Sequence, residues 1–173
     1  MDQLIQKLVA RTRRALTTWP DASGWRFTAA IGAATLAAMG AIGFSSGLYA
    51  LHPPRTRGLA ARLLTVLIAP AIGEEAVFRA VMIPDRTETA RPWVALAGMT
   101  GVFTLWHVLE AKTFLRVAEP MFLRPSFLAC AASLGLGCGL IRWWTASLWP
   151  AVGVHWLAVT VWQTWLGGLV LDD

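Results

Sequence analysis

The sequence predicts an all-α protein: a polytopic transmembrane helix bundle of about five membrane helices with an N-terminal amphipathic segment. Of the 173 residues, 56% are hydrophobic and 14% are charged, whereas about a quarter of the residues of a soluble domain are charged. The mean hydropathy is +0.55. Ten Trp accompany a single Tyr, and indole rings gather at the headgroup level of membranes. We therefore expect an integral protein embedded in the lipid bilayer.

Residues 1–26 predict a basic amphipathic segment that lies on the membrane surface. Apolar residues recur there at helical spacing, and the basic residues between them are Lys7, Arg11, Arg13, Arg14 and Arg26. The apolar stretch that follows is longer than the core of a signal peptide, which has about 7 to 15 residues. Residues 27–173 are then expected to form a single integral membrane domain.

Five apolar runs in that domain predict membrane helices. They are residues 27–51, 63–83, 93–111, 126–144 and 149–171. The first run has 25 residues without a charge, and about 20 apolar residues suffice to span the hydrocarbon core. In the fourth run, Gly135, Gly137 and Gly139 favour close packing against a neighbouring helix.

Polar segments separate these runs. We expect loops at residues 52–58 and 84–92, a short interfacial segment at 112–125, and a broken or re-entrant piece around 142–150. Eight basic residues fall on the N-terminal side of the bundle and six on the other side. This difference favours a cytoplasmic N-terminus, and the localisation we expect is the bacterial inner (plasma) membrane.

The basic balance of the chain, with a net charge of +5 and a pI of about 10.2, does not indicate a nucleic-acid partner. Its basic residues are scattered between apolar runs and are not interleaved with stacking aromatics on a polar face. Cys130 and Cys138 lie about 12 Å apart along one helix, which is beyond disulfide reach. The oligomeric state is not indicated by any feature of the sequence.

Three charged side chains interrupt the second run, in the segment Gly73-Glu74-Glu75-Ala76-Val77-Phe78-Arg79. Each such group costs about 2.5 to 3.5 kcal/mol at the middle of a bilayer and therefore marks a functional site. Glu75 and Arg79 lie on one helix face, whereas Glu74 points about a quarter turn away. We expect Arg79 to neutralise Glu75 and leave Glu74 available. The alternative is a soluble core helix with a satisfied salt bridge.

Two histidines, His107 and His155, lie deep in the third and fifth runs. Ionisable groups within a membrane converge in the bundle interior, so we expect both to meet Glu74 at one water-filled cavity. A carboxylate beside an imidazole can activate water as a general base, and a second His can donate to the oxyanion formed at an amide carbonyl. The absence of a Ser or Cys nucleophile beside a His disfavours covalent catalysis. For either His alone, the alternative is a hydrogen-bonded core residue.

The order of these residues resembles that of a known family. Three motifs are similar to those of the CPBP family, the CAAX-protease and bacteriocin-processing (Abi) intramembrane proteases: Glu74-Glu75-x-x-x-Arg79, Phe103-x-x-x-His107, and His155 after Trp149-Pro150-Ala151. The resemblance covers about residues 60–168, which we take as the catalytic core. It implies a glutamate-dependent, metal-independent endopeptidase, a hydrolase that acts on a membrane-anchored or hydrophobic peptide.

The resemblance also implies a role for each matching residue. Glu74 and His107 would activate water, and His155 would help to form the oxyanion hole. The supporting residues would be Glu75, Arg79 and Phe103.

The chain departs from the family pattern four residues after His155. The family commonly has Asn or Asp there, whereas this chain has Val159, which offers no side-chain donor. Thr160 and Gln163 are candidate substitute oxyanion donors.

The same residues also fit functions of a different kind. Glu74, His107 and His155 could bind zinc and leave a position for water, but the sequence has no His-Glu-x-x-His motif. A zinc-bound His needs an oriented partner on its other nitrogen. Only Glu75 and Glu110 could serve, but we expect Glu75 to pair with Arg79 and Glu110 to lie at the solvated membrane edge, so the partner would be lacking. We therefore expect no cofactor, with zinc as the alternative.

Two other functions remain as alternatives. A proton-coupled transporter would also need Glu and His on several helices. A non-proteolytic scaffold or immunity-type protein could share the same fold.

Overall fold

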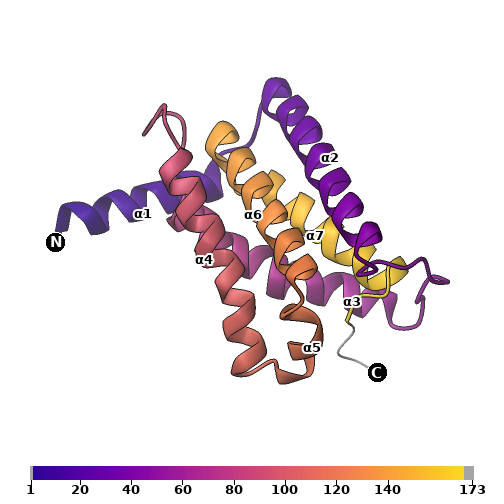
Figure 1. Cartoon of the computed structure of the whole chain (residues 1–173). Coiled ribbons are helices and arrows are strands. Elements are labelled where there is room, and N and C mark those ends of the chain that lie inside the picture. Colours follow the sequence, from indigo (N-terminus) through magenta and orange to yellow (C-terminus); the bar gives the residue numbers. More distant parts are fainter. Residues whose placement is uncertain (1, 170–173) are drawn as a thin grey trace.

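The computed structural model describes residues 2–169, and this part of the chain is helical without a β-strand (Figure 1). The all-α prediction is therefore confirmed. The elements are α1 (Asp2–Thr17), α2 (Ala22–Ser45), α3 (Leu59–Val66), the π-helical η1 (Leu67–Glu74) and η2 (Ala76–Val81), α4 (Trp93–Lys112), the 3₁₀ turn η3 (Arg116–Ala118), α5 (Glu119–Phe122), α6 (Pro125–Thr145) and α7 (Trp149–Trp165).

Within residues 2–169, three helices are long and apolar enough to cross a membrane: α2, α4 and α6. Helix α7 has 17 residues, and the helical segment from α3 to η2 changes its winding along its length. The integral membrane character of the protein agrees with the sequence, whereas the predicted number of five membrane helices is not confirmed.

Helix α6 is the centre of the bundle and packs against α2, α4 and α7. A Cβ added at Gly137 would overlap the Thr35 side chain of α2, and one at Gly139 would lie 2.8 Å from Leu96 and Met99 of α4. The absence of side chains at these two positions therefore allows the close packing that the sequence predicts.

Replacing Gly137 with Ala is expected to destabilise the bundle by about 1 to 3 kcal/mol, because the added methyl group overpacks the α2–α6 contact. Gly101→Ala is the matched control, since nothing lies within 4 Å of a Cβ added there. Ala is about 1 kcal/mol more favourable than Gly inside a helix, so this variant should not be destabilised. Thermal unfolding in detergent measures both variants. Equal midpoints for the two would contradict the packing described here.

The first membrane helix differs from its predicted range at both ends. It begins at Ala22 because Asp21 caps it, accepting a hydrogen bond from the Gly24 amide at 2.7 Å. It ends at Ser45, well before the predicted residue 51. Gly47 follows with φ of 65°, a left-handed conformation that glycine adopts without strain. The chain then turns back, so that the Tyr49 ring packs against Gly43.

Three other segments differ between the sequence-based prediction and the structure. Residues 112–125 contain the short helical elements η3 and α5. In place of the predicted re-entrant piece around residues 142–150, α6 continues to Thr145, the chain turns tightly at Ala146 with φ of 56°, and α7 begins at Trp149. Helix α7 ends at Trp165 instead of 171, and residues 170–171 lie outside the described range.

The helix that carries Glu74 is wound more widely than an α-helix from Leu67 onward. Pro70 lies inside it and cannot donate the backbone hydrogen bond that an α-helix requires at that position. π-Helical winding is frequent at functional sites. Here it spans the turns on both sides of the Glu pair.

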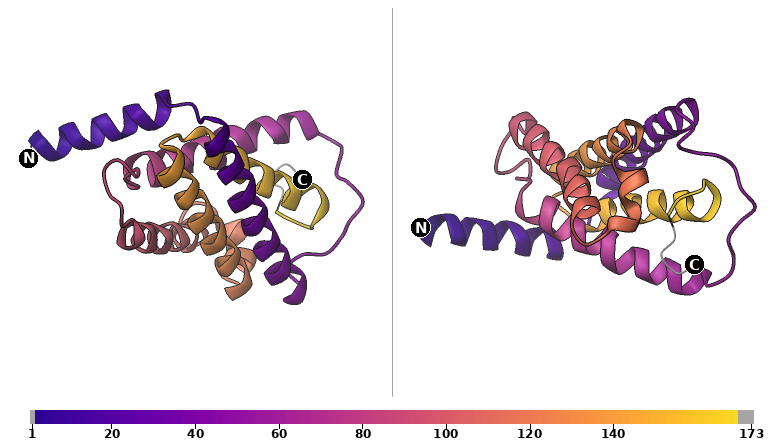
Figure 2. Two further views of the ribbon diagram at one scale, coloured as in Figure 1. Left: turned by 90° about the horizontal axis from the view of Figure 1, so that it is seen from above. Right: turned by 60° about the horizontal axis from the view of Figure 1, so that its bottom comes forward.

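Helix α1 extends away from the bundle (Figures 1 and 2). Its second half is tied to the 84–92 loop by two ion pairs. Arg11 donates to both carboxylate oxygens of Glu88 at 2.8 to 3.1 Å, and Arg14 donates to Asp85 at 3.0 Å. A basic N-terminal helix is present and half of its length is docked, but it ends at Thr17, so Arg26 of the predicted segment 1–26 belongs to α2.

These ion pairs give the docking of α1 a pH dependence. Burial raises the pKa of Asp85, but hydrogen bonds from Thr87 and the charges of Arg14 and Arg142 outweigh it, so the net pKa is lowered. Burial also raises the pKa of Glu88, but the hydrogen bond and the charge of Arg11 outweigh it, so this pKa is lowered too. A lowered carboxyl pKa stabilises the folded state above the ordinary value of about 4, and this contribution is lost as the pH falls through the lowered value.

We therefore expect the melting midpoint of the protein to fall as the pH is lowered below about 4. Arg11→Gln is expected to flatten this dependence, because Glu88 loses the partner that lowers its pKa. Thermal unfolding at a series of pH values measures the effect. An unchanged pH dependence in the variant would show that the ion pair is not its cause.

Candidate active site

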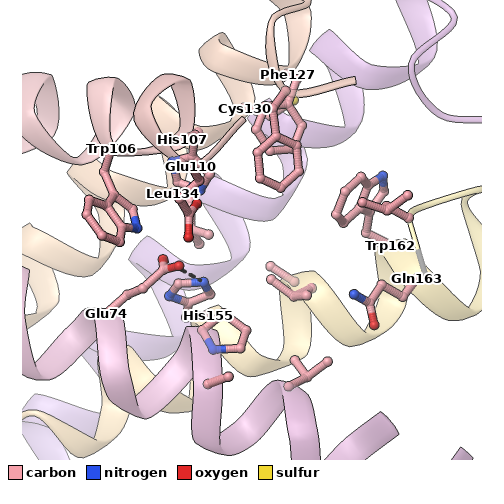
Figure 3. Close-up of a pocket in the computed structure, with 18 of the residues that line it drawn as sticks. Glu74, Trp106, His107, Glu110, Phe127, Cys130, Leu134, His155, Trp162 and Gln163 are labelled. Carbon is pink, nitrogen blue, oxygen red and sulfur yellow. Dashed lines mark ion pairs between the residues drawn. The ribbon is translucent and has the colours of Figure 1, made fainter. Parts of the chain in front are cut away.

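The ionisable residues predicted within the membrane meet at one cavity of about 480 Å³. Glu74 comes from the end of η1, His107 from α4 and His155 from α7, and all three line it. In Figure 3 their side chains point toward one another from three separate helices. The cavity at which the sequence predicts these three residues to meet is therefore present.

Glu75, Arg79 and His155 form a buried group behind this cavity. Arg79 Nη1 lies 3.2 Å from Glu75 Oε1, and both side chains are fully buried. This is the i,i+4 pair that the sequence predicts. His155 Nδ1 donates to the same Glu75 oxygen at 2.8 Å, a contact that the sequence did not reveal. Glu75 thus fixes the orientation of the His155 ring.

Glu74 remains outside this group. Its Oε2 lies 3.9 Å from His155 Nε2 and has no hydrogen-bond partner within residues 2–169. The side chain is 15% exposed, toward the cavity. The pairing of Arg79 with Glu75 therefore leaves the Glu74 carboxylate available, as the helix geometry predicts.

Phe103 connects the buried group to His107. Its ring lies under the Arg79 guanidinium, with 4.0 Å between the guanidinium carbon and the ring centroid, a favourable cation–π contact. Its backbone oxygen lies 2.9 Å from His107 Nδ1. Because a carbonyl oxygen only accepts hydrogen bonds, Nδ1 carries a proton, and when the ring is neutral its Nε2 presents a lone pair.

Glu110 belongs to the site, contrary to the position predicted from the sequence. It was expected at the solvated membrane edge, but it is half-buried and lines the cavity. One ligand atom each of Glu74, His107 and Glu110 lies within 4.8 Å of the others. Glu110 lies three residues after His107 and therefore on the same helix face. This spacing is the sequence feature from which its place in the site could have been predicted.

The same geometry changes the zinc alternative. The set with metal-ligand geometry contains Glu110 in place of the predicted His155. The expected lack of an oriented partner is also wrong, since the Nδ1 atoms of His107 and His155 are both bonded to an oxygen. Two carboxylates and an imidazole with its second nitrogen held in this way fit a divalent cation. These residues can therefore hold a metal as well as activate water.

The two candidate substitute donors lie in different places. Among the described residues, those that line the cavity include Val159 and Gln163 but not Thr160. Thr160 is buried. Figure 3 shows Gln163 beside Trp162 and away from Glu74. Gln163 therefore faces the cavity at a different part of its wall from the carboxylate.

The remainder of the cavity wall is mainly apolar. It includes Phe127, Cys130, Leu134 and Trp162, which come from α6 and α7. An apolar chamber that ends at carboxylate and imidazole groups can accept an extended hydrophobic substrate and hold it beside an activated water.

The helical membrane fold and this site place the protein in a class, the polytopic membrane proteins with carboxylate and imidazole groups buried between their helices. The sequence model of one family within that class, described as type II CAAX prenyl endopeptidase Rce1-like, matches residues 56–161. The chain belongs to this Rce1-like family, which is a family of membrane proteases. The searches of curated proteins and of solved structures returned no match.

Proposed function

We propose that this protein is an intramembrane endopeptidase in which Glu74 and His107 activate a water molecule to hydrolyse a peptide bond. The observation that carries the proposal is the separation of the two glutamates. Arg79 pairs with Glu75, whereas Glu74 lines the cavity and, within residues 2–169, has no Lys or Arg as an ion-pair partner. A general base must be within reach of water and free of a competing cation.

In the proposed reaction, His107 Nε2 accepts one hydrogen of the water and orients it. Glu74 takes the other proton as the water oxygen attacks the substrate carbonyl carbon. The tetrahedral oxyanion accepts a hydrogen bond from His155 Nε2, which requires protons on both ring nitrogens while Nδ1 keeps its bond to Glu75. The carbon–nitrogen bond then breaks, and the leaving amine receives the proton from Glu74.

The substrate that we propose is a membrane-anchored or hydrophobic peptide, because most of the cavity wall is apolar. The family is described as type II CAAX prenyl endopeptidase Rce1-like, so a prenylated CAAX tail is one candidate. We also propose an inner-membrane location with the N-terminus in the cytoplasm, which places the basic end of the bundle inside.

The experiment is a cleavage assay with the purified protein in nanodiscs. Membrane-anchored peptides that end in a CAAX sequence, with and without a prenyl thioether, are incubated with the protein and analysed by mass spectrometry. We expect cleavage at one peptide bond by the wild type and none by Glu74→Gln. Intact peptides together with Glu74-dependent proton flux across proteoliposomes would favour the transporter. Neither activity would favour the non-proteolytic scaffold or immunity-type protein.

A second candidate chemistry uses a zinc ion held by Glu74, His107 and Glu110, whose ligand atoms lie within 4.8 Å of one another. We favour the metal-independent reaction, because Glu74 and His107 already supply both acceptors that an attacking water needs. The two mechanisms predict different responses to a chelator.

A further inference from the structure

Helix α1 lies outside the segment that matches the family, which covers residues 56–161. Its second half nevertheless reaches the junction between the segment that carries the glutamates and the helix that carries His155. Ala15 is fully buried there, in a small apolar core with Ala71 and Ala80 of η1 and η2 and with Leu148 and Val152 at the start of α7. Helix α1 therefore contacts both the glutamate-bearing segment and the start of the helix that carries His155.

Hydrogen bonds fasten the same junction. Arg11 Nη1 donates to the Val81 carbonyl oxygen at 3.0 Å, which satisfies a carbonyl at the end of η2. On the other side, the Leu148 amide donates to Ala15 O at 2.9 Å and the Trp149 indole donates to Leu16 O at 2.9 Å. A single helix thus bridges the end of the glutamate-bearing segment and the beginning of α7.

The first half of α1 has no such partner within the described residues, and it projects from the bundle (Figure 2). Leu4, Ile5 and Val9 expose 63%, 53% and 62% of their surface. They lie on one side of the helix and so form an exposed apolar strip. The side chains of Lys7 and Arg13 are also exposed. An exposed apolar strip flanked by basic side chains is the form of a helix that lies in a membrane interface.

Two Trp side chains close to the C-terminal end of α1 indicate that this part of the protein lies at the level of the lipid headgroups. Trp19 and Trp25 stack edge to face at 5.5 Å just after α1, and they are 69% and 40% exposed. Indole rings at such exposure favour the membrane–water boundary. The arm formed by residues 2–10 would therefore lie where lipid headgroups are, and the exposed charges of Lys7 and of Arg13 further along α1 would favour anionic ones.

We propose that α1 is a brace that binds anionic lipid headgroups through Lys7 and Arg13 and thereby holds the glutamate-bearing segment and α7 together. Its apolar strip enters the interface, and its docked half transmits this attachment to the junction at Ala15. The inference concerns lipid binding and stability, so it stands independently of the proposed proteolysis.

The test uses the full chain in nanodiscs of phosphatidylcholine, with or without phosphatidylglycerol. Hydrogen–deuterium exchange of residues 2–10 reports attachment of the arm, and thermal unfolding reports the brace. Phosphatidylglycerol is expected to slow exchange in the wild type, by about fivefold for each basic side chain near the anionic surface. It is also expected to raise the melting midpoint.

Matched variants separate specific attachment from general charge. Lys7→Gln combined with Arg13→Gln is expected to lose both effects. Lys7→Arg with Arg13→Lys is expected to keep them, and so is Arg57→Gln with Arg116→Gln, which removes the same charge from exposed positions elsewhere. Equal exchange in the two lipids, or an undiminished effect in the Lys7 and Arg13 neutral variant, would overturn the proposal.

Arg11→Gln tests the brace itself. Arg11 is 12% exposed and bonded to Val81 and Glu88, so its loss should loosen the docked half without removing an exposed charge of the arm. We expect phosphatidylglycerol still to slow exchange of residues 2–10 in this variant but no longer to raise the melting midpoint. A full rise in the midpoint would show that α1 binds lipid without bracing the bundle.

Discussion

Replacing Glu74 with Gln lowers the rate of peptide hydrolysis by about 10²- to 10⁴-fold, the range expected for loss of a general base, and leaves the melting midpoint close to that of the wild type. Gln retains the size of the side chain but cannot take a proton from water. The stability is preserved because, among residues 2–169, the Glu74 Oε2 oxygen has no hydrogen bond to lose. Initial rates in nanodiscs and thermal unfolding measure the two quantities.

Glu75→Gln is the matched comparison, since it makes the same chemical change at the adjacent position. Glu75 accepts from His155 and pairs with Arg79, so this variant should lose stability together with activity. An active Glu74→Gln protein would end the assignment of Glu74 as the base. A stable, inactive Glu75→Gln protein would reverse the roles of the two glutamates.

Replacing Arg79 with Ala is expected to destabilise the protein by about 3 to 5 kcal/mol, because breaking a buried ion pair leaves an uncompensated charge. Arg79 and Glu75 are both fully buried. The change also removes the guanidinium from the Phe103 ring. Expression yield and thermal unfolding measure the loss.

A double variant separates the charge from the packing. Glu75→Gln combined with Arg79→Met removes both charges, and replacing a buried pair by uncharged residues of similar volume is often tolerated. We expect it to recover part of the stability that Arg79→Ala loses. If Arg79→Ala instead matched Glu74→Gln in yield and melting, the division between a supporting pair and a free base would be wrong.

The sequence was sufficient for features that follow from local geometry. The Glu75–Arg79 pair could be predicted because residues four apart share a helix face. The convergence of Glu74, His107 and His155 on one cavity could be predicted because a membrane leaves ionisable side chains few other places to lie. Neither inference requires knowledge of how the helices pack.

Contacts that depend on helix rotation were not predictable in this way. The bond between His155 and Glu75 and the approach of Glu110 to Glu74 depend on how α4 and α7 are turned toward η1. The π-helical winding after Leu67 further shifts the register of that helix. The ends of α2 depend on a single cap at Asp21 and on the turn at Gly47, which hydropathy does not register.

The central claim, that Glu74 and His107 activate water without a metal, is tested most directly by elemental analysis of the purified protein beside a chelator titration of its peptidase activity. We predict no stoichiometric transition metal and a cleavage rate that survives a strong chelator. The contrary result would be stoichiometric zinc, with activity lost on chelation and restored by zinc alone. Loss of that zinc in Glu110→Gln would then assign the metal to Glu74, His107 and Glu110.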